Sequence, residues 1–249
     1  MTEALLVAHN LTKRFGGLAA VQDISISLVR NTIHAVIGPN GAGKSTLTNL
    51  LSGDIAPTSG SMHLLGKDMT GASPEKISRN GLGRSYQKTN IFLPLSVWDN
   101  VHLAAQSRQQ HALRWLSNAT KFEAARAITA MALEQSGLKN QEKTMASAMS
   151  HGEQRQLEVA MALATQPQVL LFDEPLAGMG TAEAERMITL LHSLRKNHAI
   201  LLVEHDMDAV FALADTLTVM VNGQMIASGT PADIRKNAAV QAAYLGEEH

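Results

Sequence analysis

The chain has 249 residues, of which 45% are hydrophobic, so it can bury a substantial core. Its 21 Lys and Arg residues are balanced by 22 Asp and Glu residues, which argues against a broad basic face, and we expect no nucleic-acid partner. The absence of cysteine excludes disulfides, thiolate metal sites and cysteine nucleophiles.

The sequence contains no pattern typical of export or of membrane insertion. The first residues, MTEALLVAHNLTKRF, lack a basic start followed by an apolar core and a small-residue cleavage site. Apolar runs such as Val169–Phe172 and Ile200–Val203 have the length of strands, far short of the roughly 20 residues of a membrane-spanning helix. We therefore expect a cytoplasmic chain that reaches the membrane only through a partner.

The first third of the chain predicts strands and then a helix. Residues 5–10 and 22–29 favour antiparallel β-structure. Residues 32–37 predict a buried strand, followed by a glycine-rich turn and a helix over about 43–51. Ser73 precedes a proline, a pattern that favours the start of a further helix.

The middle of the chain predicts helices. Residues 97–109 and 121–136 have helical patterns, and no convincing strand lies between residues 90 and 149. We interpret this part as a helical insertion.

The remainder returns to alternating strands and helices. Residues 168–172 and 199–203 predict strands that are buried on both faces, with a helix over 181–196 between them. Thr230 before a proline favours another helix start. This alternation predicts an α/β fold with a parallel sheet.

A phosphate-binding loop follows the predicted strand at 32–37. The segment GPNGAGKST matches G-x-x-x-x-G-K-[ST] between a strand and a helix, where backbone N–H groups and the helix N-terminus favour phosphate. Lys44 is expected to contact the β- and γ-phosphates of ATP, and Ser45 to ligate Mg²⁺. The candidate nucleotide-binding residues of this loop are Gly38, Pro39, Asn40, Gly41, Ala42, Gly43, Lys44, Ser45 and Thr46.

Two acidic residues end the predicted strand at 168–172. In VLLFDEP, Asp173 and Glu174 are expected at the carboxyl edge of a parallel sheet, where such folds bind ligands. We expect Asp173 to hold Mg²⁺ and Glu174 to activate the attacking water. Together with Lys44, the pair predicts a nucleotide hydrolase.

The segment MSHGEQRQL resembles the signature of the ABC ATPases. Ser150 and Glu153 also form a capping box, S-x-x-E, so a purely structural role is the alternative interpretation. The resemblance implies that Ser150, Gly152 and Glu153 contact the γ-phosphate of ATP bound to the opposite subunit of a dimer.

Three further positions match motifs of the same family in the same order. The resemblance implies that Gln87, in GRSYQ, contacts Mg²⁺ and the attacking water, and that His205, in LLVEHD, contacts the γ-phosphate. It also implies that Phe15, in TKRFGG, stacks on adenine. Taken alone, His205 after a strand could be incidental and Phe15 could belong to the core.

The resemblance covers about residues 5–229 and implies one ABC ATPase domain over 1–249. Its expected parts are a P-loop NTPase (RecA-like) core with an antiparallel β subdomain over 1–88 and 155–235, a helical subdomain with the signature over 89–154, and a tail over 236–249.

Within the family, the chain is most similar to the ATPase subunits of branched-chain amino acid importers. The stretches FGGLAAV, HGEQRQLEVAMAL, EPLAGM and AAYLGEE carry this similarity, although the tail also resembles that of lipopolysaccharide-export ATPases. The resemblance implies transmembrane permease subunits, a second ATPase subunit in a homo- or heterodimer, and an external solute-binding protein as partners. The alternatives are a lipid or lipopolysaccharide exporter subunit, a non-transport ABC ATPase and a scaffold that no longer hydrolyses ATP.

The chain departs from the general ABC pattern at three positions. His151 replaces a signature glycine and Glu153 replaces glutamine; we interpret both as tolerated variants, and His151 as a packing residue. Gly180 stands where the family has Asp or Asn in a loop that reports to the opposite site. Hydrolysis is expected to survive this change, with weaker communication between the two sites.

Overall fold

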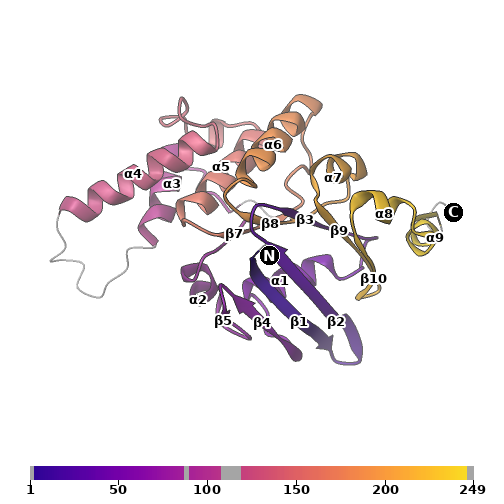
Figure 1. Ribbon diagram of the computed structural model, residues 1–249. Helices are drawn as coiled ribbons and strands as arrows, with labels where there is room; N and C mark the ends of the chain where they lie inside the picture. Colours follow the sequence, from indigo (N-terminus) through magenta and orange to yellow (C-terminus); the bar gives the residue numbers. More distant parts are fainter. Residues whose placement is uncertain (1–2, 87–89, 108–118, 246–249) are drawn as a thin grey trace. The chain divides into compact units, whose positions relative to one another are not determined.

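The computed structural model describes residues 3–86, 90–107 and 119–245 (Figure 1). The chain divides into two compact units. The α/β unit consists of Met1–Leu82, Gln168–Glu174 and Arg195–His249, and the helical unit consists of Gly83–Pro167 and Pro175–Leu194.

A four-stranded antiparallel sheet begins the α/β unit, in the order β2-β1-β4-β5. Its strands are β1 (Ala4–Phe15), β2 (Leu18–Val29), β4 (Ser59–Leu64) and β5 (Lys67–Asp68), drawn in indigo and purple in Figure 1. In the second half of β2, buried side chains alternate with exposed ones, as expected for a strand with one face on a core. The predicted antiparallel strands are confirmed, and both are longer than expected.

The second sheet has the strand order β10-β9-β3-β8-β7-β6. Its strands are β3 (Ile33–Ile37), β6 (Leu82–Arg84), β7 (Val169–Asp173), β8 (Ala199–Val203), β9 (Thr216–Val221) and β10 (Gln224–Gly229). β3, β7, β8 and β9 pair in parallel, whereas β10 is antiparallel to β9. Every residue of β3, β7 and β8 is buried, which confirms the three strands predicted from continuous apolar runs.

Among the described residues of the α/β unit there are five helices, and two of them begin at the predicted caps. They are α1 (Lys44–Ser52), α2 (Pro74–Arg79), α7 (Met207–Leu213), α8 (Pro231–Arg235) and α9 (Ala238–Leu245). The Ser73 hydroxyl accepts a hydrogen bond from the Lys76 N–H at 3.4 Å, and the Thr230 hydroxyl accepts one from the Asp233 N–H at 3.3 Å. Each hydroxyl thus satisfies one of the N–H groups that a helix start leaves unbonded.

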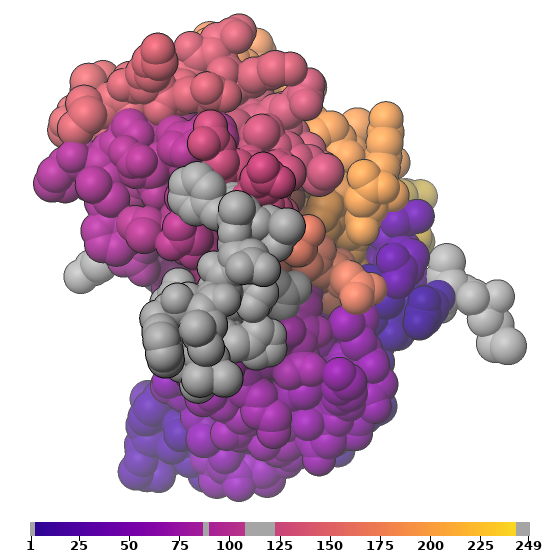
Figure 2. Space-filling view, turned by 90° about the vertical axis from the view of Figure 1, so that its left-hand side faces the viewer, coloured from indigo at the N-terminus to yellow at the C-terminus, as the bar shows by residue number. Residues whose placement is uncertain are grey.

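The helical unit contains α3 (Val97–Ser107), α4 (Ala119–Gln135), α5 (His151–Ala164) and α6 (Thr181–Leu194). α3, α4 and α5 pack on one another, and α6 packs on α5. α3 and α4 form much of the magenta and pink face in Figure 2. Because α5 and α6 join this packing, the unit is larger than the segment 89–154 expected to be the helical subdomain. Part of the helix predicted over 97–109 lies outside the described residues.

No helix in the described part of the chain is both long enough and apolar enough to span a bilayer.

Candidate functional site

The loop after β3 bends where side chains would not fit. A Cβ atom added at Gly38 would lie 2.1 Å from the Met220 carbonyl oxygen, and one at Gly43 would lie 2.3 Å from the Ala20 carbonyl oxygen. Gly43 also has φ of 98°, a left-handed conformation that costs little only for glycine. These glycines allow the loop to turn directly from β3 into the N-terminus of α1, as the phosphate-loop prediction requires.

Lys44, the first residue of α1, lies back over this loop. Its ammonium donates hydrogen bonds to the Gly38 carbonyl at 2.5 Å and to the Pro39 carbonyl at 3.0 Å, and the residue is only 8% exposed. A cation held at the N-terminus of a helix, among loop N–H groups, is suited to an anionic ligand. Phosphate oxygens bound here would compete with the two carbonyls for the Lys44 protons.

Asp173, at the end of β7, is held against the first turn of α1. Its Oδ2 accepts a hydrogen bond from the Thr48 hydroxyl at 3.3 Å, and the residue is 3% exposed. Ser45, on the same turn of α1, is exposed. A carboxylate and a hydroxyl on neighbouring elements fit Mg²⁺, which takes few protein ligands and completes its shell with phosphate and water. The sequence analysis missed Thr48, although its position four residues after Lys44 on a helix was a usable signal.

Glu174 and His205 follow adjacent parallel strands. Asp173 on β7 pairs with Val203 on β8, and the Glu174 N–H donates to the Val203 carbonyl at 2.8 Å. Glu174 has φ of 51°, a left-handed value uncommon for non-glycine residues and frequent at functional sites. His205 lies two residues beyond β8, and its side chain is 65% exposed. The structure therefore brings both residues to the carboxyl edge of the parallel sheet.

Glu204 supports His205 and was not singled out from the sequence. Its side chain is fully buried, and its Oε2 accepts a hydrogen bond from the His205 N–H at 3.2 Å. The same oxygen lies 3.8 Å from the imidazole Nδ1 of His205. A fully buried carboxylate that contacts the next residue's backbone restrains that residue. The sequence signal was an acid directly after an apolar strand.

Phe15 is an exposed aromatic residue at the end of β1. Its ring is 50% exposed, and the Lys13 ammonium lies 5.2 Å from the ring centroid. Its exposure excludes the core role that the sequence left open. Stacking on adenine stays a prediction.

The signature segment begins a helix through the capping box that the sequence predicts. Ser150 is the N-cap of α5: its hydroxyl accepts from the Glu153 N–H at 3.3 Å, and the Ser150 N–H donates to the Glu153 carboxylate at 2.9 Å. That second bond is the main reason why the pKa of Glu153 lies below its ordinary value. Glu153 also accepts from Gln141 at 3.0 Å, so its carboxylate is engaged within the helical unit.

His151 is exposed and contacts the loop before α6, and its expected role as a packing residue stays a prediction. Its Nε2–H donates to the Ala177 carbonyl at 3.2 Å, and a Cβ atom at Gly178 would lie 3.3 Å from the His151 ring. A Cβ atom at Gly180 would meet nothing within 4 Å. Packing in the helical unit therefore does not require glycine at position 180, because a side chain would fit there.

Gln87 lies outside the described residues, but the residues on either side of its segment are bonded to α5. Arg155 donates to the Tyr86 carbonyl at 2.8 Å, and Glu158 accepts from the Asn90 N–H at 2.7 Å. Arg155 and Glu158 form an ion pair at 2.9 Å, with side chains 8% and 5% exposed. Burial raises the pKa of Glu158, and its hydrogen bonds oppose this rise. The sequence analysis missed this pair, although its i, i+3 spacing was visible.

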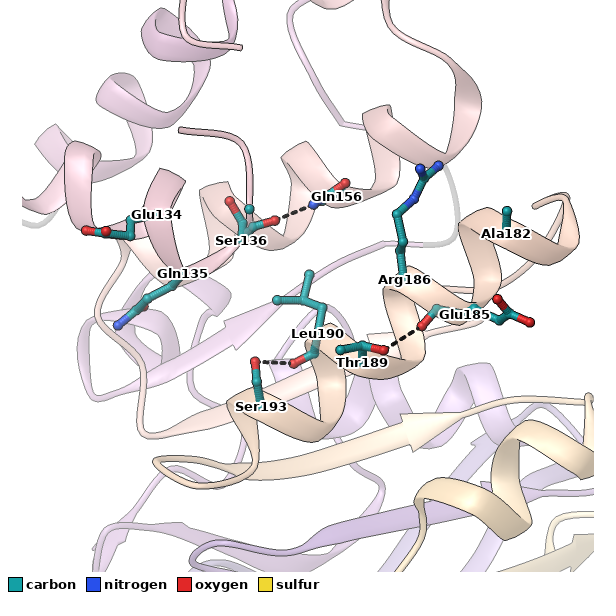
Figure 3. Close-up of a pocket in the computed structure, with 11 residues that line it drawn as sticks. Glu134, Gln135, Ser136, Gln156, Ala182, Glu185, Arg186, Thr189, Leu190 and Ser193 are labelled. Carbon is teal, nitrogen blue, oxygen red and sulfur yellow. Dashed lines mark hydrogen bonds between the residues drawn. The ribbon is translucent and has the colours of Figure 1, made fainter. Parts of the chain in front are cut away.

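An open groove of about 580 Å³ lies along the helical unit (Figure 3). It is bounded by the end of α4, by Gln156 of α5 and by one side of α6. Gln156 donates to the Ser136 carbonyl, and Arg186 extends from α6. Within the described residues, no group of three or more His, Asp or Glu side chains could hold a metal ion, in this groove or elsewhere.

Parts of the chain match two sequence families, and several relatives match it over nearly its full length. Residues 21–177 match the family described as ABC transporter, and residues 224–249 match the branched-chain amino acid ATP-binding cassette transporter family. The chain is 37% identical to the high-affinity branched-chain amino acid transport ATP-binding protein LivG of Salmonella typhimurium. This match covers 99% of the chain and 100% of LivG. The chain is 36% identical to the corresponding protein BraF of Pseudomonas aeruginosa, with the same coverage.

Solved structures have the same fold. A nucleotide-free ATP-binding cassette from an ABC transporter superposes with a TM-score of 0.87 at 28% identity, over 98% of this chain and 100% of that one. The ADP conformation of an ATP-binding cassette of an ABC transporter superposes with a TM-score of 0.85 at 28% identity, over 99% of this chain and 100% of that one. These matches confirm the predicted P-loop NTPase fold.

Proposed function

Because the chain belongs to the ABC transporter family of ATP-binding proteins, which hydrolyse ATP, we propose that it is the ATPase subunit of an importer for branched-chain amino acids or a related small polar solute. The observation that carries the ATPase assignment is the convergence of Lys44, Asp173, Glu174 and His205 on one edge of the α/β unit. The names of the relatives LivG and BraF support the substrate class.

In the proposed reaction, the loop N–H groups and Lys44 bind the phosphates of ATP. Phe15 stacks on the adenine. Glu174 accepts a proton from the attacking water, and His205 contacts the γ-phosphate, restrained by Glu204 beneath it. The exposed imidazole of His205 and the left-handed turn at Glu174 leave both side chains at the sheet edge rather than in the core.

Mg²⁺ would be held by Ser45 and Asp173, with Gln87 as a third contact. When bound, the metal neutralises charge on the β- and γ-phosphates. The Thr48 hydroxyl, which also lies 3.0 Å from the Ser45 carbonyl, contacts the Asp173 carboxylate at 3.3 Å and places it beside α1.

The second half of the proposed site comes from another subunit. Ser150 and Gly152 would contact the γ-phosphate bound to the opposite ATPase subunit, in a homo- or heterodimer, and Glu153 would hold the start of α5 through the capping box. Loss of one well-placed donor to a developing charge costs on the order of 3 kcal/mol of transition-state stabilisation. ATP then joins the two subunits, and hydrolysis releases them.

The helical unit would transmit this closure to a transmembrane permease at the cytoplasmic face of the membrane. Several large apolar side chains of this unit are exposed, and a permease helix that covered any of them would gain free energy from their burial. They are Phe92, Leu93, Leu103, Met131 and Met145.

Affinity purification of the tagged chain from its native membrane, followed by mass spectrometry, tests this assignment. We expect two polytopic permease subunits, a second ATPase and a solute-binding protein of the amino-acid type. Recovery of a lipid-export permease, or of no membrane protein, would contradict the import assignment and leave the ATPase assignment standing.

A further inference from the structure

A carboxylate from α6 lies on the signature of the same subunit. The Glu183 Oε1 accepts a hydrogen bond from the Ser150 hydroxyl at 2.8 Å. Its Oε2 accepts from the Gly180 N–H at 3.4 Å, and the Glu183 N–H donates to the Gly180 carbonyl at 3.0 Å. Glu183 thus connects the signature hydroxyl to the loop that precedes α6. All of these residues belong to the helical unit.

The same carboxylate covers the backbone of Gly152. A Cβ atom added at Gly152 would lie 2.6 Å from the Glu183 carboxyl carbon and 2.8 Å from each of its oxygens. Only a glycine permits this approach without displacement of the Glu183 side chain. Glu183 therefore contacts both Ser150 and Gly152, which the proposed function assigns to the γ-phosphate of the opposite subunit's ATP.

Ser150 cannot serve both anions with the same proton. A serine hydroxyl has one O–H group, and here that proton is donated to Glu183. Its oxygen already accepts from the Glu153 N–H as the helix cap. A phosphate oxygen at the signature would need the same proton, and its negative charge would be repelled by a carboxylate over Gly152.

We propose that Glu183 is a positioning residue that occupies the signature in the absence of ATP and competes with the γ-phosphate for the Ser150 hydroxyl. The inference rests on the proposed role of Ser150 toward the opposite subunit. Arrival of the phosphate transfers the Ser150 hydrogen bond from Glu183 to ATP and releases the carboxylate. Since the Gly180 N–H is bonded to the same carboxylate, the loop before α6 loses a contact in that step.

The test measures ATP hydrolysis against ATP concentration in the complex purified with its own membrane and ATPase partners. Glu183→Gln keeps the side-chain size and an acceptor oxygen but removes the charge. We expect KM for ATP to fall roughly fivefold, with kcat within about twofold of the parental value. Glu185→Gln is the matched control, because Glu185 is an exposed acid on the same helix that faces the open groove. It is expected to leave both constants unchanged.

A Ser150→Ala variant separates this inference from the proposed function. It is expected to raise KM for ATP, because the phosphate loses a donor. If Ser150→Ala raises KM but Glu183→Gln leaves it at the parental value or raises it too, competition by Glu183 is overturned and the signature role stands. If Ser150→Ala has no effect while the parental complex hydrolyses ATP, the signature role itself fails. Equal thermal midpoints for the variants show that they are folded.

Discussion

At the scale of single residues, the proposed function makes Glu174 the residue on which hydrolysis of the bound ATP depends. It follows β7 in a left-handed conformation and is bonded through its N–H to β8, so its side chain leaves the sheet at a fixed point. We expect Glu174→Gln to reduce the hydrolysis rate by a factor of about 100 or more, since a general base contributes that much. Binding of a fluorescent ATP analogue should be retained. Hydrolysis at the parental rate would exclude Glu174 as the base.

His34 makes the stability of the α/β unit sensitive to pH. It lies in β3, where its Nδ1–H donates to the Ser27 carbonyl at 3.3 Å and its Nε2 accepts from the Thr218 hydroxyl at 2.8 Å. Burial lowers the pKa of His34 from 6.5 to about 4. Between these values the unfolded chain binds a proton that the folded chain does not, so stability is lost as the pH falls below about 6.5.

We expect this residue to contribute a loss of about 2 kcal/mol in the free energy of unfolding between pH 7 and pH 5. Urea unfolding at several pH values measures it. A His34→Gln variant, which cannot titrate, should have a flatter pH profile than the parental protein. Equal slopes for the two proteins would show that His34 does not titrate in this range.

We expect Gly180 to affect communication between the two ATP sites rather than folding. Its carbonyl accepts from the Glu183 and Ala184 N–H groups at 3.0 and 2.9 Å, and it has room for a side chain. We expect Gly180→Asn to leave the free energy of unfolding within about 0.5 kcal/mol, because Asn is a favourable residue at a helix start. The Hill coefficient of ATP hydrolysis in the assembled complex should rise. A large loss of stability would contradict this account of the loop.

At the scale of elements, α5 carries a buried ion pair whose loss is costly. Arg155→Met leaves the Glu158 carboxylate buried without its cation, and we expect a loss of about 3 kcal/mol in the free energy of unfolding. Lys139→Met is the control, since Lys139 and Glu134 form an exposed pair worth at most about 1 kcal/mol. Glu158→Gln added to Arg155→Met should recover part of the loss. If Arg155→Met and Lys139→Met lowered the free energy of unfolding equally, burial of the Arg155–Glu158 pair would not account for the cost.

The elements that the sequence predicts best are those with a strong local signal. β3, β7 and β8 are continuous apolar runs, and α2 and α8 begin at a hydroxyl followed by proline. The sequence analysis did not identify β4, β9 or β10. In β10, QMIASG, no residue is fully buried, so the strand is determined by its pairing with β9 rather than by its own composition.

In the candidate site, too, the parts with a local sequence pattern could be predicted and the contacts between distant residues could not. The phosphate loop, the Asp173–Glu174 pair and the capping box are local patterns, so the sequence contains them. The contact from Thr48 to Asp173 joins residues 125 positions apart, and that from Ser150 to Glu183 joins residues 33 apart. Such contacts depend on how the elements pack, and no pattern in one segment specifies them. The nucleotide roles of the individual residues remain predictions.

At the scale of the whole molecule, ATP chemistry belongs in the proposed function to the α/β unit, and contact with the permease belongs to the helical unit. Each unit has its own buried core, and the signature and α6 belong to the helical one. A transporter that couples ATP hydrolysis to solute movement requires ATP chemistry and permease contact in one assembly, because hydrolysis alone moves no solute.

Uptake into proteoliposomes that contain the purified transporter, with its solute-binding protein outside and ATP inside, tests whether this chain powers amino-acid import. We predict uptake of radiolabelled leucine, isoleucine or valine that requires ATP and disappears when this chain carries Glu174→Gln. ATP hydrolysis without uptake of any of these amino acids, by a complex that contains all of its partners, would contradict the assignment as a branched-chain amino acid importer.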